Sequence, residues 1–238
     1  MEVPVYLITG FLESGKTTFI QQVILEGNFV EDEKTLLILT EEGEIEIEPE
    51  LLEQYNVDVV TVEDKADFTV DFLKKCRREH RPQQVIIEYN GMWPVSEFMR
   101  MQLPYRWELF QVVSTVDAST FQLYMNNMRS LMSDILTCTG MAIFNRCNEE
   151  TTDIAYLVRN VKVLNSKAEL IFEAENGDIL DPGEEILPYD VNQDVIEISD
   201  ENYGIWYLDA LDHGERYEGK QVIIKGMVFR SKNFEEGY

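Results

Sequence analysis

The sequence predicts an α/β protein built on a doubly wound, mostly parallel sheet. Two observations carry this prediction. Short apolar runs rich in β-branched residues recur along the 238-residue chain, and stretches with helical periodicity separate them. Runs that are apolar throughout are typical of strands buried on both faces of a parallel sheet. Strands that alternate with helices in this way favour the open α/β class over all-β or all-α folds.

The expected strands can be given by residue range. They cover residues 3–9, 34–39, 57–62, 84–89, 110–118, 141–145 and 168–174, and the expected helices cover about 16–27, 66–80, 94–101, 119–137 and 150–163. In open α/β sheets, ligands bind at the carboxyl ends of the strands. The residues that follow each strand are therefore the place to look for a functional site.

The amino-acid composition of the chain changes after about residue 175. We expect a nucleotide-binding domain over 1–175, a linker over 176–190 that is rich in Gly, Pro, Asp and Asn, and a small or truncated segment over 191–238. That last segment contains a short helix candidate and one clear strand, KQVIIKGMVFR (220–230). A lone strand cannot bury its faces, so this β-containing segment is expected to be incomplete.

Composition limits the classes of partner. The formal net charge is −25, which makes polyanionic nucleic acid an unfavourable partner. The basic stretch KKCRREHRP (74–82) is interpreted as the C-terminal turn of a helix. No apolar run is long enough to insert in a membrane, and the N-terminus lacks the pattern of a signal peptide. Three scattered cysteines indicate reduced thiols. These features predict a cytoplasmic protein.

A phosphate-binding loop is the most specific motif. Residues 10–17, GFLESGKT, match GxxxxGK[ST] at every fixed position, between an expected strand and an expected helix. Lys16 is expected to bridge β- and γ-phosphate oxygens, and the Thr17 hydroxyl to bind Mg²⁺. Thr18 is placed for the α-phosphate. The residues expected to bind the nucleotide here are Gly10, Glu13, Ser14, Gly15, Lys16, Thr17 and Thr18.

A second motif, EYNG (88–91), ends a later apolar strand. Its carboxylate, Glu88, is expected to hold the hydration shell of Mg²⁺ or to polarise a water, and the N–H of Gly91 to contact a γ-phosphate. We therefore assign catalytic roles to Lys16 and Glu88. The alternative interpretation of this motif is an ordinary turn after a strand.

A third motif, NRCN (145–148), ends the strand at 141–145 and looks like a variant of the guanine-reading NKxD motif. Asn145 is expected to brace the loop and the base, and the aliphatic stem of Arg146 to lie on the ring. Asn148 stands where that motif has a carboxylate, and an amide offers one acceptor oxygen and adds donors. Base recognition is therefore predicted to be relaxed or weakened.

With these motifs in place, residues 1–175 resemble the CobW-like family of P-loop GTPases. TGFLESGKTT (9–18), TEEGEIEIE (40–48), EYNG, VVSTVDA (112–118) and NRCN each occupy the place of a family motif. The resemblance implies Mg²⁺ and GTP as ligands, metal ligands at Thr17, Glu41 and Glu88, and a role in metal homeostasis. The family's CxCC metal motif has no counterpart, because no cysteine precedes Cys76.

The C-terminal segment is similar to the start of a small domain in a bacterial two-component putative permease family. That similarity implies a membrane permease subunit as a partner, beside a metal-dependent client protein. We expect a GTPase or a looser NTPase that hydrolyses the β–γ phosphoanhydride and gates a partner or a transport process. The alternatives are a nucleotide-gated scaffold with little turnover and a small-molecule kinase.

Overall fold

The computed structural model describes residues 2–25, 29, 33–41, 47, 49–148, 150–180, 187 and 189–226. The chain divides into two compact units, residues 1–182 and residues 183–238. Residues 42–46 and 48 of the expected switch segment lie outside the described residues, as do residues 181–186 and 188 of the expected linker and residues 227–238.

The first unit is built on one sheet. Its strands are β1 (Val3–Thr9), β2 (Thr35–Leu39), β3 (Val57–Thr61), β4 (Gln84–Glu88), β5 (Trp107–Asp117), β6 (Met141–Cys147), β7 (Glu169–Ala174) and β8 (Ile179–Leu180). The spatial order is β3-β2-β4-β1-β5-β6-β7-β8, and every pair is parallel except β7–β8. The expected doubly wound, mostly parallel sheet is confirmed.

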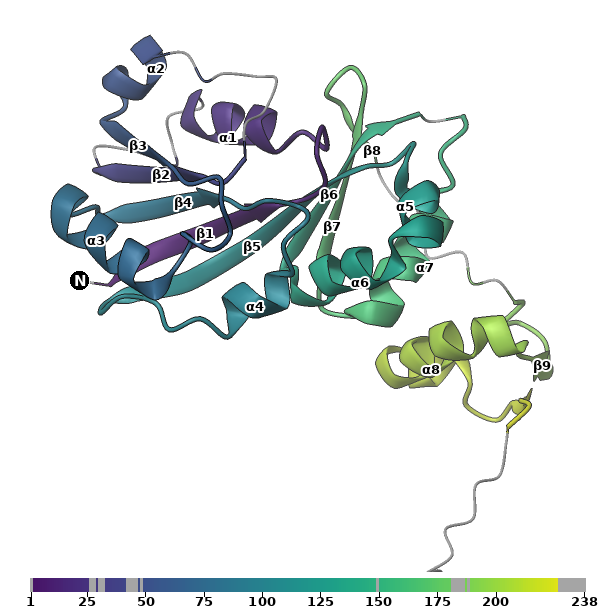
Figure 1. Cartoon of the computed structure of the whole chain (residues 1–238). Helices are drawn as coiled ribbons and strands as arrows, with labels where there is room; N and C mark the ends of the chain where they lie inside the picture. Colours follow the sequence, from purple (N-terminus) through teal and green to yellow (C-terminus); the bar gives the residue numbers. More distant parts are fainter. Residues whose placement is uncertain are drawn as a thin grey trace, which may run out of the picture. The chain divides into compact units, whose positions relative to one another are not determined.

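Helices cover both faces of this sheet (Figure 1). α1 (Lys16–Leu25) and α2 (Pro49–Gln54) lie on one face. The other face carries α3 (Val70–His80), α4 (Val95–Met99), α5 (Phe121–Asn127), α6 (Arg129–Cys138) and α7 (Ile154–Leu164). Strand residues alternate between these two layers: Leu36 and Ile38 pack toward α3–α7, whereas Leu37 packs toward α1.

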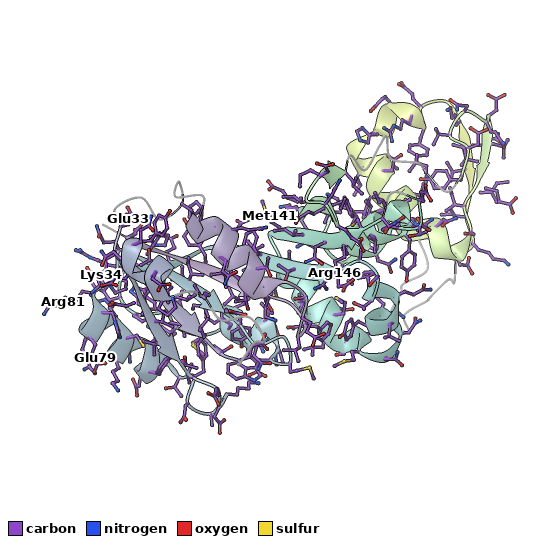
Figure 2. All side chains as sticks on the ribbon, turned by 90° about the horizontal axis from the view of Figure 1, so that it is seen from above. Glu33, Lys34, Glu79, Arg81, Met141 and Arg146 are labelled. Carbon is purple, nitrogen blue, oxygen red and sulfur yellow. The ribbon has the colours of Figure 1, made fainter. Side chains whose placement is uncertain are left out.

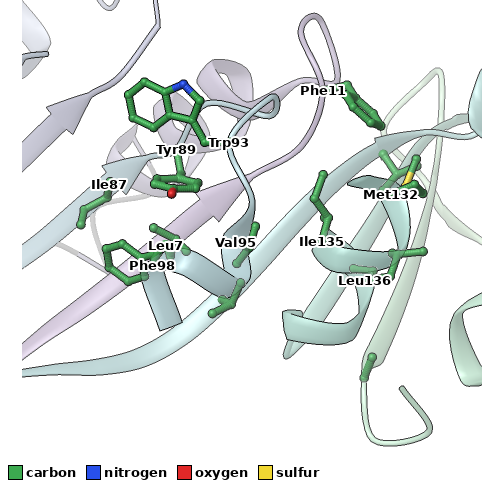
Figure 3. Close-up of a cluster of buried hydrophobic side chains, with 14 of the residues drawn as sticks. Leu7, Phe11, Ile87, Tyr89, Trp93, Val95, Phe98, Met132, Ile135 and Leu136 are labelled. Carbon is green, nitrogen blue, oxygen red and sulfur yellow. The ribbon is translucent and has the colours of Figure 1, made fainter. Parts of the chain in front are cut away.

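The larger of the two cores positions the loop that follows β4 (Figure 3). Tyr89 is 2% exposed and packs edge-on against Trp93 and Phe98, with ring centroids 5.5 and 5.6 Å away. Edge-to-face pairs of this kind add to the free energy gained by apolar burial. The residues directly after Glu88 are thus held by a buried aromatic cluster.

Several element boundaries differ from those expected. The helix expected over 119–137 is divided into α5 and α6 at Met128, whose φ of −131° is not helical. α3 begins at Val70 rather than 66, because the Thr69 side chain accepts a hydrogen bond from the Phe72 N–H and caps the helix. α2 was not expected, and β8 lies within the expected linker.

The second unit contains a two-stranded parallel sheet of β9 (Val195–Glu197) and β10 (Gln221–Ile223). Two 3₁₀ turns, η1 (Asp200–Asn202) and η2 (Gly214–Arg216), and α8 (Tyr203–Asp212) join them. Of the strand expected over 220–230, residues 221–223 form β10, and residues 227–230 lie outside the described residues. Its partner β9 was not expected. Among the residues that the structure describes in either unit, no helix has the length and apolar character to span a membrane.

Candidate functional site

The loop between β1 and α1 has the backbone of a phosphate cradle. Gly10 and Gly15 have φ of 142° and 94°, values that a side chain disfavours. A Cβ on Gly15 would lie 2.6 Å from Nδ2 of Asn145, so glycine also permits a close approach between two loops. The loop opens the N-terminus of α1, where free N–H groups and the helix dipole favour anions.

Lys16 is buried in this loop. Its Nζ donates hydrogen bonds to the carbonyl oxygens of Gly10 and Phe11, at 2.8 and 2.9 Å. The same ammonium forms an ion pair with Glu41, and the two side chains are 3% and 11% exposed. A buried charge requires a partner of this kind. Glu41 therefore binds the ammonium group that, according to the motif, would bind phosphate oxygens.

Thr17 contacts the carboxylate at the end of β4. Its Oγ1 donates to Oε1 of Glu88 at 2.8 Å. Glu88 is 3% exposed, and burial raises its pKa, although the Thr17 hydrogen bond and the nearby Lys16 charge act in the opposite direction. Of the three oxygen ligands predicted for Mg²⁺, Glu41 thus pairs with the Lys16 ammonium, and Thr17 and Glu88 contact each other. Their chemistry fits Mg²⁺, which prefers oxygen donors from one or two carboxylates.

Thr40 joins the two loops that supply those carboxylates, although no role was predicted for it. It is fully buried, and its Oγ1 donates to the Glu88 carbonyl at 2.9 Å and accepts from the Asn90 N–H at 2.7 Å. A polar residue directly after a buried strand was the signal that could have identified it. Through Thr40, the segments that begin at Glu41 and at Glu88 are attached to each other.

Gly91 approaches the phosphate loop from the β4 side. A Cβ there would lie 2.1 Å from the Gly10 carbonyl oxygen and 2.7 Å from Cα of Phe11. Both neighbours are backbone atoms, so they cannot move aside as a flexible side chain can. Glycine at position 91 is therefore required for the loop after β4 to pack on the phosphate loop.

Asn145 and Arg146 hold the phosphate loop from the other side. Asn145 Nδ2 donates to the Ser14 carbonyl at 2.7 Å, and Arg146 Nη1 donates to the Glu13 carbonyl at 3.0 Å. Arg146 also pairs with Asp117 at 2.5 Å. Figure 2 labels Arg146 well away from Arg81, which follows α3 in the basic stretch. Arg146 is thus a cation beside the phosphate loop, whereas the 74–82 stretch is the helix end that we expected.

Asp117 completes this contact. Burial raises its pKa, but hydrogen bonds from Ser119 and Arg146 outweigh that effect, so the net pKa is lowered. Its Oδ1 accepts from both the N–H and the hydroxyl of Ser119, at 2.9 and 2.6 Å. Asp117 therefore shapes the turn that leads into α5 and carries the charge that orients Arg146.

Asn148 is engaged with its own loop. Its Oδ1 accepts the backbone N–H groups of Glu150 and Thr151, both at 3.0 Å, and the side chain is exposed. This arrangement is typical of Asn in a turn. The acceptor oxygen that the motif assigns to a base is occupied by backbone donors here.

A pocket opens at the carboxyl ends of β6 and β7, beside Thr18. The residues that line it are Gly15, Thr18, Phe19, Gln22, Thr115, Ile143, Asn145, Arg146, Glu173, Ala174 and Glu175. Asn148 is not among these lining residues. Glu173 and Glu175 were missed at the sequence level, because nothing local distinguishes them from the chain's many surface carboxylates. Their place at the end of the strand 168–174 was the signal available.

Other candidate ligands do not gather into a metal centre. Within the described residues, no group of three or more His, Cys, Asp or Glu side chains is placed to hold a metal ion. Cys76 is buried, and His80 instead contacts Asp58 through Nδ1 at 2.9 Å. Cys76 and His80, both on α3, thus have different surroundings.

Most of the first unit is similar to known proteins. A family model described as the CobW/HypB/UreG nucleotide-binding domain matches residues 4–172. A zinc chaperone CobW from Sinorhizobium sp is 28% identical over 104 residues, which cover 38% of this chain and 28% of that protein. The matched region thus spans less than a third of that curated relative.

Two solved structures share the fold. The Zn(II)-bound YjiA GTPase from E. coli superposes with a TM-score of 0.55 at 18% identity, over 76% of this chain and 60% of that one. The hydrogenase maturation factor HypB from Archaeoglobus fulgidus has a TM-score of 0.53 at 14% identity, over 73% of this chain and 82% of that one. At these identities the likeness concerns the fold alone.

Proposed function

Because the chain belongs to the CobW/HypB/UreG nucleotide-binding domain family, we propose that it is a Mg²⁺-dependent P-loop nucleoside triphosphatase, a GTPase of the CobW-like type. The observation that carries the proposal is the contact of Lys16 and Thr17 with Glu41 and Glu88. The two phosphate-loop side chains that would bind phosphate and Mg²⁺ each contact a carboxylate from a different later loop. Those loops are where a γ-phosphate would be sensed.

Each residue has a separate task in this proposal. Lys16 would exchange the Glu41 carboxylate for β- and γ-phosphate oxygens, which carry more negative charge. Thr17, Glu88 and Glu41 would hold Mg²⁺, which neutralises phosphate charge when bound. Glu88 would orient the attacking water, and the N–H of Gly91 would contact the γ-phosphate. Thr40 would transmit a change at Glu41 to the loop after β4.

The second candidate is a nucleotide-gated binding module with little turnover. The engagement of Asn148 with its own loop favours it, because base recognition then lacks one expected contact. In either case the nucleotide state would gate a partner, either a metal-dependent client protein or a membrane permease subunit. A metal-homeostasis role rests on family membership, and the permease partner rests on the C-terminal segment.

The test is Mg²⁺-dependent binding and hydrolysis of GTP by the purified chain and by Lys16→Ala. We expect Lys16→Ala to weaken GTP binding by about 100-fold or more, because it removes charge-assisted hydrogen bonds to two phosphates. Lys74→Ala is the matched control, since Lys74 is exposed on α3. Equal binding by the wild type and Lys16→Ala would contradict the proposal. Multiple turnover of GTP by the wild type would support the GTPase. If the wild type binds GTP but hydrolyses it no faster than Lys16→Ala does, the binding module is supported instead.

A further inference from the structure

The pocket at the ends of β6 and β7 lies where the base of a nucleotide would extend from the phosphate loop. Gly15 and Thr18 line one side of it, and Asn145 and Arg146 line another. Thr18 is the residue placed for the α-phosphate, and Asn145 and Arg146 hold the phosphate loop. A nucleotide whose phosphates lie at Lys16 would therefore place its base here.

Two carboxylates and a buried amide oxygen provide hydrogen-bond acceptors in this pocket. Asn145 Oδ1 is buried and has no hydrogen-bond partner among the described residues, whereas Nδ2 of the same amide donates to the Ser14 carbonyl. Glu173 and Glu175 add two carboxylates. Arg146 is the cation of the pocket lining, and its guanidinium is already bound to Glu13 and Asp117. A ligand that offers N–H donors would satisfy these groups.

Glu173 is placed to accept from such a ligand. Its neighbour Phe172 is buried in the core beneath α3–α7, so the alternation of the strand turns Glu173 toward the α1 face, as it does Ile171. The pairing of β6 with β7 shifts register between Phe144 and Cys147, which is where Asn145 lies. Glu173 is half-buried on a strand, whereas Glu175 is exposed in the following turn.

We propose, on the basis of the nucleotide-binding function proposed above, that Glu173 is the carboxylate that reads the donor edge of a guanine base. Guanine presents N1–H and the N2 amine side by side, and a carboxylate accepts two such donors in a bidentate pair. Adenine presents one amine and no adjacent N–H. Glu173 thereby supplies, from β7, the acceptor that Asn148 does not present.

The experiment compares the dissociation constants of GDP, IDP and ADP by calorimetry. Inosine lacks the N2 amine, so the wild type is expected to bind GDP more tightly than IDP. Glu173→Gln is expected to lose about 10- to 100-fold in GDP affinity and to bring the GDP-to-IDP ratio close to one, because an amide offers a single acceptor and no charge. Glu173→Ala should act in the same direction.

The controls separate this inference from the proposed function. Glu169→Gln, exposed at the start of the same strand, should leave the ratio unchanged. Inorganic pyrophosphate should bind equally to the wild type and Glu173→Gln, which shows that the variant's phosphate loop is intact. The inference is wrong if the GDP-to-IDP affinity ratio is unchanged in both Glu173 variants, or if it falls to about one in Glu175→Gln instead. Neither result would contradict the proposed function. A wild type that binds no nucleotide and no pyrophosphate overturns both.

Discussion

The phosphate end and the base end of the candidate site are built in different ways. At the phosphate end, side chains from three loops contact one another directly: Lys16 meets Glu41, and Thr17 meets Glu88. At the base end, Asn145 and Arg146 hold the phosphate loop, whereas Asn148 binds its own turn. The pocket there is completed by Glu173 and Glu175, which belong to no recognised motif.

This difference teaches that the two ends are under different constraints. The phosphate end is closed by charges that balance one another, so a change in one of its groups should affect the others. At the base end, the buried Asn145 Oδ1 has no partner among the described residues, and one of the two carboxylates, Glu175, is exposed, so these groups should act more independently. Three further predictions can sharpen or break this comparison.

The largest effect is expected from Glu41→Gln. In the nucleotide-free state this change leaves the Lys16 ammonium without its carboxylate, so phosphate no longer has to displace Glu41. Nucleotide affinity measured without Mg²⁺ is expected to rise about 10-fold, which corresponds to ~1.4 kcal/mol. If Glu41 also holds Mg²⁺, the gain should shrink when Mg²⁺ is added. Glu97→Gln, on the exposed part of α4, is the control. Weaker binding in the absence of Mg²⁺ would show that Glu41 does not compete for Lys16.

An intermediate effect is expected on the pH dependence of stability. Burial raises the pKa of Glu88 above its ordinary value of 4.5, so above pH 4.5 the native state binds more protons than the unfolded state. The free energy of unfolding should therefore fall as the pH rises through the native pKa of Glu88, by at most ~1.4 kcal/mol per pH unit.

Glu88→Gln removes this titration. The variant's stability relative to the wild type should increase with pH above 4.5, as measured by urea unfolding across a pH series. A constant difference between the two proteins across that series would contradict the role of Glu88 burial. Such a result would also weaken the view that the phosphate end is a set of mutually balanced charges.

The smallest effect is expected from Asn148→Ala at the base end. The change removes two hydrogen bonds in an exposed turn, so the free energy of unfolding should fall by about 1 kcal/mol. Because Asn148 does not line the pocket, the GDP-to-IDP affinity ratio should stay within about twofold of the wild type. If this ratio fell to about one in Asn148→Ala, the result would show that Asn148 of the NRCN motif recognises the base.

Much of this architecture could be predicted from local patterns. The apolar runs predicted every strand from β1 to β7. Strands such as β2 and β4 are buried along almost their whole length, so they must be largely apolar. Short elements were harder: α2, β8 and β9 span six, two and three residues, and they carry too little periodicity to be recognised. The break at Met128 was also missed, since residues on both sides of it keep a helical pattern.

By itself, the sequence determined the phosphate loop and the sheet that carries it, and it indicated Glu41 and Glu88 as candidate Mg²⁺ ligands. These features depend on residue types at fixed spacing, on backbone freedom at glycine, and on the rule that parallel strands end at one edge. Tertiary structure alone decided that Glu41 pairs with Lys16, that Thr40 joins the two loops, and that Glu173 faces the pocket while Asn148 does not. Those outcomes depend on strand alternation, on a register shift and on competing backbone donors, which bring together residues far apart in the chain.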